Sequence, residues 1–96
     1  MSDILQLGGN IELCGVSAID PATLIVLKKL VGNYARQFSN KMPVEKLSIT
    51  ITKHDTGVSL VGILVTNNTS YTAEIQDKNL FLGLDAALKE IEKKIV

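Results

Sequence analysis

The sequence contains few of the residues on which metal sites, disulfides and aromatic cores depend. Its 96 residues include one cysteine, one histidine and no tryptophan, and aromatic residues make up 4% of the chain. Cys14 alone cannot form an internal disulfide, and with His54 as the single histidine no Cys/His cluster can hold zinc. We therefore expect no metal site and a core built from aliphatic side chains.

Targeting signals and long apolar runs are also missing. The first ten residues lack the basic start and apolar centre of a signal peptide, and no apolar stretch approaches the roughly 20 residues of a membrane-spanning helix. These absences predict a cytoplasmic protein with no membrane partner. Ten Lys plus Arg balance ten Asp plus Glu, so net charge exerts no long-range pull toward nucleic acid, and DNA is not an expected partner.

The chain is long enough for one domain with a single core. Residues 1–9, which end in two glycines, are predicted to be a flexible leader, and residues 10–96 the domain. Apolar residues that alternate with polar ones predict strands at 10–16, 45–54 and 70–76, and a run with apolar residues on both faces predicts a central strand at 58–66. Helices are predicted between the first two strands and after the last one, so the fold class is α+β, in the order β-α-β-β-β-α.

The connections set the predicted topology. A helical crossover makes the first two strands parallel, and hairpins make the rest antiparallel, which gives a four-stranded mixed sheet with both helices on one face. The other face is predicted to meet water. It carries the polar residues Ser48, Thr50, Thr52, Thr72, Glu74 and Gln76, together with part of the apolar set of the third strand.

The first helix has a clear start and a mixed outer side. Asp20 can cap its first turn, and Pro21 suits the first helical position. Its predicted buried stripe, on a helix that extends to about residue 40, consists of Leu24, Leu27, Val31, Tyr34, Ala35 and Phe38. Ile25 and Val26 fall on the outer side beside basic residues. They indicate either contact with a large partner or ordinary apolar side chains on a monomer surface.

The last helix, at residues 79–95, is amphipathic. Its predicted buried stripe is Phe81, Leu84, Leu88, Ile91 and Ile95. Lys89 and Lys93 point away from that stripe, and Asp85 lies four residues before Lys89, the spacing of an exposed ion pair. Asp77 or Asn79 can cap this helix.

No catalytic motif is present. The chain has no nucleophile elbow, no Gly-rich phosphate loop and no base placed beside its cysteine, so we expect neither enzymatic activity nor a cofactor. His54 is interpreted as a solvated turn residue. What remains is a basic surface on two helices, in which lysines act as point charges on phosphates and an arginine grips one with two hydrogen bonds. Its candidate residues are Lys28, Lys29, Arg36, Lys89 and Lys93.

Two segments resemble the ribosome hibernation-promoting factors, also called ribosome-associated translation inhibitors or the sigma-54 modulation protein family. In the terminal helix, Phe81 to Asp85 and Ile91 to Lys93 are similar to the family pattern of an aromatic, two small residues, an aliphatic and Asp, followed by a Leu-Glu pair and a base. The opening strand, Ile11 to Gly15, leads to Asp20-Pro21-Ala22, where the family commonly has Thr-Pro-Ala. Basic residues precede apolar ones at Lys29-Leu30 and in Arg36-Gln-Phe38. The resemblance covers residues 10–95.

This resemblance implies a fold close to a double-stranded-RNA-binding domain with an extra first strand. It also implies binding to the small ribosomal subunit in the channel for mRNA and tRNA, which blocks translation when growth stops. Lys29, Arg36 and Lys93 would then contact phosphates of ribosomal RNA.

Two other functions remain open from the residues. One is a homodimeric interaction module that uses the exposed sheet face or the Ile25 and Val26 patch and ignores RNA. The other is a general binder of double-stranded RNA, which needs no ribosome.

Overall fold

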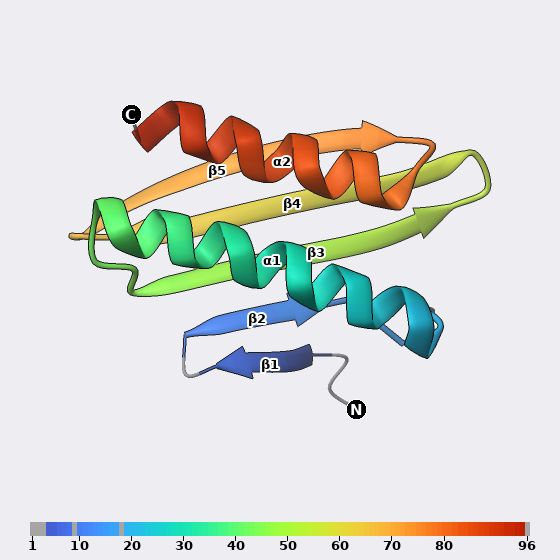
Figure 1. The fold of residues 1–96 in the computed structure, drawn as a ribbon. Coiled ribbons are helices and arrows are strands. Elements are labelled where there is room, and N and C mark those ends of the chain that lie inside the picture. The colour runs from blue at the N-terminus through green and yellow to red at the C-terminus, as the bar shows by residue number, and fades with distance from the viewer. Residues whose placement is uncertain (1–3, 9, 18, 96) are drawn as a thin grey trace.

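The computed structural model describes residues 4–8, 10–17 and 19–95 (Figure 1). Its elements are β1 (Ile4–Gly8), β2 (Ile11–Cys14), α1 (Pro21–Lys41), β3 (Lys46–His54), β4 (Gly57–Thr66), β5 (Thr69–Asp77) and α2 (Leu80–Ile95). The fold is α+β, with two helices and a five-stranded mixed sheet. Figure 1 shows both helices on the same face of the sheet, so the predicted layering is confirmed.

The strands lie in the order β1-β2-β3-β4-β5. β2 and β3, which α1 connects, are parallel, and the other neighbours are antiparallel. The parallel pair and the antiparallel β3–β4–β5 meander agree with the topology predicted from the connections. Among the described residues no helix is long and apolar enough to cross a membrane.

The prediction of a flexible leader and a four-stranded sheet is wrong. Residues 4–8 form β1, which pairs with β2 so that Leu5 faces Leu13 and Gln6 faces Glu12. Leu5 and Leu7 pack against the core while Gln6 Nε2 donates to Glu12 Oε2 at 3.2 Å on the other side. Burial of these two leucines and a ladder to β2 are what hold the segment in place. Residues 1–3 and 9 of the supposed leader lie outside the described residues.

The start of α1 follows from its first residues. Asp20 Oδ2 accepts a hydrogen bond from the Thr23 backbone N–H at 3.0 Å, and Pro21 is the first helical residue, as predicted. The link from β2 turns at Gly15, where φ is +80° and an added Cβ would lie 2.0 Å from the Ile51 carbonyl oxygen. No other residue type fits there without moving β3.

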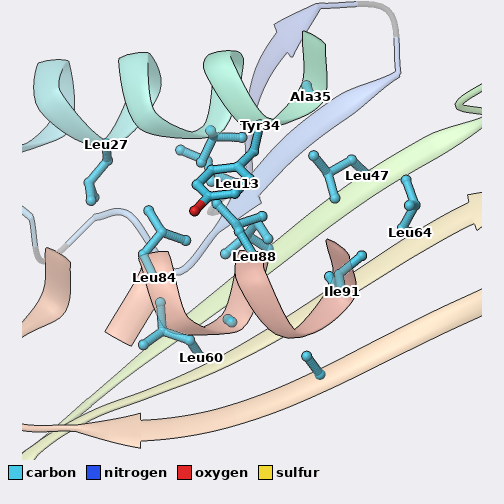
Figure 2. Close-up of a cluster of buried hydrophobic side chains, with 14 of the residues drawn as sticks. Leu13, Leu27, Tyr34, Ala35, Leu47, Leu60, Leu64, Leu84, Leu88 and Ile91 are labelled. Atoms are coloured by element: carbon cyan, nitrogen blue, oxygen red, sulfur yellow. The ribbon is translucent and has the colours of Figure 1, made fainter. Parts of the chain in front are cut away.

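The core lies between the sheet and the two helices (Figure 2). Leu27, Val31 and Phe38 of α1 are fully buried, as are Leu84, Leu88 and Ile91 of α2. From the sheet the fully buried residues are Leu13, Leu47, Ile49, Leu60 and Leu64. The predicted aliphatic core is therefore confirmed. The buried aromatic residues in the described part of the chain are Phe38 and Tyr34, whose rings lie 6.0 Å apart.

Within the described part of the chain, no helix or strand covers the face of the sheet away from the helices (Figure 1). Thr50, Thr52, Thr72, Glu74 and Gln76 are exposed and Ser48 is half-buried, so this face meets water as predicted. The apolar set of β4 predicted for it is there too. Ile63 is exposed, and Val61 and Val65 are half-buried.

Candidate nucleic-acid interface

All five candidate cations are exposed and lie on the two helices. Lys28, Lys29 and Arg36 belong to α1, and Lys89 and Lys93 to α2. The helices lie side by side with their N-termini at the same end of the sheet (Figure 1), and they contact each other. The cations therefore share the outer layer of the molecule.

Helical spacing decides which cations point the same way. Lys29 and Arg36 are seven residues apart, so they lie on one stripe of α1, two turns and about 10 Å from each other. Lys28 is turned by about 100° from Lys29 and lies on the flank of the helix. On α2, Lys89 and Lys93 are four residues apart and share a face. The outward-facing set is thus Lys29, Arg36, Lys89 and Lys93.

A hydrogen-bonded bridge fixes α1 against α2. The Tyr34 hydroxyl donates to Asp85 Oδ1 at 2.7 Å, and Lys89 Nζ lies 3.0 Å from Asp85 Oδ2. The hydrogen bond from Tyr34, followed by Lys89, lowers the pKa of Asp85. Burial, and next the bond to Asp85, raises the pKa of Tyr34 above its usual range. Asp85 is therefore charged and Tyr34 neutral across physiological pH.

The predicted Asp85–Lys89 ion pair is confirmed, and it affects the candidate site. Lys89 is engaged by a carboxylate that also serves Tyr34, so part of its charge is already compensated. Lys28, Lys29, Arg36 and Lys93 make no salt bridge within residues 4–8, 10–17 and 19–95. Four of the five cations are thus available to an external anion.

Charge is distributed unequally between the helices. Residues 21–41 contain four cations, the fourth being Lys41, and no acidic residue. Residues 80–95 contain three lysines and three acids, which gives 3 − 3 = 0. The basic surface is accordingly a property of α1, and α2 adds mainly Lys93 to it.

Exposed apolar side chains lie at the start of both helices. Ile25 and Val26 are 54% and 49% exposed on α1, as predicted for the outer side. Leu82 is 63% exposed on α2. Phe81, which was predicted to join the buried stripe, is 37% exposed, and the fully buried part of that stripe is Leu84, Leu88 and Ile91. The end of the helix layer where both helices begin is thus more apolar than the stretch that carries Arg36 and Lys93.

A second group of polar side chains lies at the β3–β4 hairpin, outside the helix layer that carries the candidate cations. His54 Nε2 lies 2.8 Å from Ser59 Oγ, and both are at the β3–β4 hairpin, with His54 exposed as predicted. A surface hollow of about 200 Å³ beside it is lined in part by Lys78 and Asp77. Across the described parts of the chain, no three His, Cys, Asp or Glu side chains are grouped so as to hold a metal ion.

Sequence reasoning missed the Tyr34–Asp85 hydrogen bond. It placed Tyr34 on the buried stripe, which is correct, and Asp85 in a surface ion pair, which is also correct. A buried tyrosine hydroxyl needs a partner, and that need was the available signal. The chain matches no protein-family model, and no curated protein matches it at a significant level.

Proposed function

We propose that this protein is a ribosome-associated translation inhibitor that binds RNA of the small ribosomal subunit. The contact surface is the outer stripe of α1 with Lys29 and Arg36, extended by Lys93 of α2. RNA phosphates are its ligands. The protein acts by occupying the channel for mRNA and tRNA and not by catalysis.

The observation that carries this proposal is the charge of α1. Four cations and no acid lie on one 21-residue helix of a chain whose total charge is zero. Lys29 and Arg36, both exposed, have no salt-bridge partner among the described residues, so phosphates meet no internal competitor there. A local basic stripe on a neutral protein binds polyanions at close range without strong long-range attraction.

Two further points support the ribosomal partner. Counted from β2, the element order β-α-β-β-β-α is the one implied by the resemblance to the hibernation-promoting factors, and β1 is an addition at the sheet edge. The residues that the resemblance assigns to RNA phosphates, Lys29, Arg36 and Lys93, are all exposed on the helix layer. Because these side chains are already exposed, they can contact a partner without movement of a helix or loop.

Co-sedimentation with purified small subunits across a salt series tests the proposal. Binding should weaken steeply as salt rises, because phosphate contacts release counterions. The Lys29→Glu, Arg36→Glu variant should lose it. The matched control is Lys53→Glu, Lys78→Glu, which makes the same change in net charge on exposed residues of β3 and of the β5–α2 link. If both variants bind as the wild type does, the proposed surface is wrong.

Free RNA separates the ribosomal partner from general duplex binding. A short RNA duplex added in excess should not displace the protein from small subunits. Displacement by this excess of duplex would mean that the helix surface recognises RNA double helices in general.

A further inference from the structure

β5 (Thr69–Asp77) is a long, regular edge strand. It lies at the outer edge of the sheet (Figure 1) and pairs with β4 through nine consecutive residue pairs without a register shift. It contains no proline. The opposite edge differs, because β1 has five residues and its pairing with β2 shifts register between Gln6 and Gly8. A long, flat edge is a ready template for another strand, whereas a short, irregular one is not.

The turn before β5 determines which backbone groups point outward. Asn67 and Asn68 both have positive φ, of 48° and 65°, as in the type I′ turn of a two-residue hairpin. The flanking pair, Thr66 and Thr69, is then hydrogen-bonded, and bonding to β4 alternates from there. The N–H and C=O groups that face away from β4 are therefore those of Ser70, Thr72, Glu74 and Gln76.

A separate contact leads to the same assignment. The Lys94 ammonium group, from α2, donates a hydrogen bond to the Thr72 carbonyl oxygen. A carbonyl bonded into the β4 ladder would point into the sheet, so this contact places the Thr72 carbonyl at the outer edge. It also shows that the free edge of β5 is open to an outside donor.

We propose that β5 pairs antiparallel with β5 of a second copy of this chain, about a two-fold axis at Ala73. Residues 69–77 are centred on Ala73 and complementary to themselves under that symmetry. The hydrogen-bonded pairs join Thr72 to Glu74 and Ser70 to Gln76 of the other copy. Tyr71 then faces Ile75, so apolar meets apolar on the helix side.

Charge fixes this register. The acidic side chains of β5 are Glu74 and Asp77, and in the proposed pairing they face Thr72 and Thr69 of the second copy. Shifting the axis to Glu74 would set two glutamates directly opposite each other, which is unfavourable. Shifting it to Thr72 would leave Gln76 and Asp77 unpaired. The Ala73 axis alone uses the whole strand without a like-charge contact.

Burial also favours a second copy as the occupant. Tyr71 and Ile75 are half-buried at the sheet edge and pack against the core beneath α2. α2 packs on both β4 and β5, so pairing of two β5 strands brings two α2 helices together on the same face (Figure 1). Such an interface is isologous and closed. Pairing must displace Lys94 from the Thr72 carbonyl, which weakens the dimer.

The wild-type protein provides the first test. Sedimentation equilibrium should show a reversible monomer–dimer transition, and amide hydrogen exchange should be measured on both sides of it. The N–H groups of Thr72 and Glu74 should become protected only in the dimer, while those of Tyr71 and Ala73 are protected in both states. A protein that stays monomeric at millimolar concentration, or a dimer with Thr72 and Glu74 unprotected, would overturn the proposal.

Three substitutions make the test specific. Glu74→Pro removes an outward N–H, a change that an edge strand tolerates, and should weaken dimerisation by about tenfold or more. Glu74→Ala alters the same side chain but keeps that N–H, and should still dimerise. Lys94→Ala frees the Thr72 carbonyl and should strengthen the dimer. Circular dichroism melts check that Glu74→Pro remains folded, and equal dimerisation by the proline and alanine variants would contradict the pairing.

The dimer and the RNA interface are separable. The Lys29→Glu, Arg36→Glu variant should dimerise as the wild type does, because its substitutions lie on the outer stripe of α1 and not on β5. Loss of small-subunit binding with intact dimerisation is the result that both proposals predict. Undiminished small-subunit binding by this variant would contradict the RNA surface alone, and loss of dimerisation would contradict the β5 interface alone.

Discussion

The two helices present similar inner faces and different outer ones. Both bury aliphatic residues, Leu27 and Val31 on α1 and Leu84 and Leu88 on α2. Outside, α1 has four cations and no acid, whereas α2 has three of each. Two lysines of α2 are also engaged, Lys89 by Asp85 and Lys94 by the Thr72 carbonyl.

The difference in outer faces indicates that α2 anchors the helix layer and that α1 binds the partner. The polar groups of α2 bond to α1 and to β5, so they hold the helix layer together. The cations of α1 contact nothing charged within the described residues and remain available to a partner. Amphipathic periodicity alone makes the two helices look equivalent, whereas their charge composition and their side-chain contacts distinguish them.

The largest expected effect comes from reversing charge on each helix in turn. Lys29→Glu, Arg36→Glu on α1 should weaken small-subunit binding by about a hundredfold or more, because two phosphate contacts become repulsions. Lys89→Glu, Lys93→Glu on α2 makes the same change in net charge. It should weaken binding by no more than about tenfold, since Lys89 is already paired with Asp85.

Filter binding or co-sedimentation at one fixed salt concentration compares these variants directly. The slope of log affinity against log salt should also fall more for the α1 variant. If the two variants lose small-subunit affinity equally, both helices contribute equally to the interface, and the larger number of unpaired cations on α1 does not affect binding.

Sequence reasoning predicted the parts of the fold that have long, regular patterns. α1 and α2 follow the helical repeat, β3 and β5 alternate apolar with polar residues, and β4 is a long apolar run, so the predicted ends of these elements lie within a few residues of those observed. β1 was missed because five residues give a weak pattern and Gly8-Gly9 resembled a boundary. What identifies β1 as a strand is its pairing with β2, which no local pattern contains.

The candidate site was predicted in its residues and not in its internal contacts. Spacing showed that Lys29, Arg36 and Lys93 face outward, since direction follows from the helical repeat. The helical repeat does not show whether the core extends beneath a given residue. For this reason it predicts that Phe81 is buried, although Phe81 is exposed. Nor does it show contacts between distant residues such as Tyr34 and Asp85, which are 51 positions apart.

A Gly→Ala substitution should raise the unfolding free energy when made in α1 and lower it when made in α2. In α1, an added Cβ at Gly32 meets nothing within 4 Å, so Gly32→Ala should stabilise the protein by about 1 kcal/mol through helix propensity. In α2, a Cβ at Gly83 would lie 2.6 Å from Leu60 Cδ1 and 3.1 Å from Asp77 Cβ. Gly83→Ala should therefore destabilise it by a net ~1–2 kcal/mol through overpacking.

Urea unfolding of both glycine variants measures the two changes in unfolding free energy. The two positions serve as controls for each other, because the chemical change is identical and only the surroundings differ. Stabilisation by Gly83→Ala would show that α2 can move away from β4 at little cost, contrary to its assigned anchoring role.

Removing the hydroxyl of Tyr34 should cost about 1 kcal/mol of unfolding free energy at neutral pH, the usual value of one hydrogen bond. Tyr34→Phe keeps the ring and its packing against Phe38 while it breaks the bond to Asp85. The depressed pKa of Asp85 stabilises the fold above its ordinary pKa near 4, and that contribution is lost as pH falls through the folded value.

Tyr34→Phe should therefore lose less stability than the wild type on acidification. At alkaline pH the contribution of the bridge to stability is lost as the pH rises. The raised pKa of Tyr34 contributes stability that is fully present below the ordinary tyrosine pKa of about 10 and is lost as pH rises from there through the higher folded value, a loss that Tyr34→Phe does not have. Parallel pH profiles for the two proteins would show that the bridge does not contribute to stability.

The smallest expected effect concerns the two N-caps, which differ in chemistry. Asp20 caps α1 with a carboxylate, and Asn79 Oδ1 caps α2 by accepting from the Leu82 N–H at 3.0 Å. Hydrogen bonds from Thr23 lower the pKa of Asp20. Its contribution is thus present above the ordinary pKa near 4 and lost as pH falls through the lower folded value, while the neutral amide of Asn79 has no such dependence.

Exchanging the two side chains should exchange the pH dependence. Asp20→Asn preserves the cap geometry and should reduce the loss of unfolding free energy between pH 7 and pH 3. Asn79→Asp should increase that loss by a few tenths of a kcal/mol, because a carboxylate at a helix N-terminus is favoured by the helix dipole only while it is charged. If neither substitution alters the difference between pH 7 and pH 3, then the first turns of the helices contribute nothing to acid lability, which comes from other carboxylates with a lowered pKa, such as Asp85 beside Tyr34 and Glu12 beside Lys46.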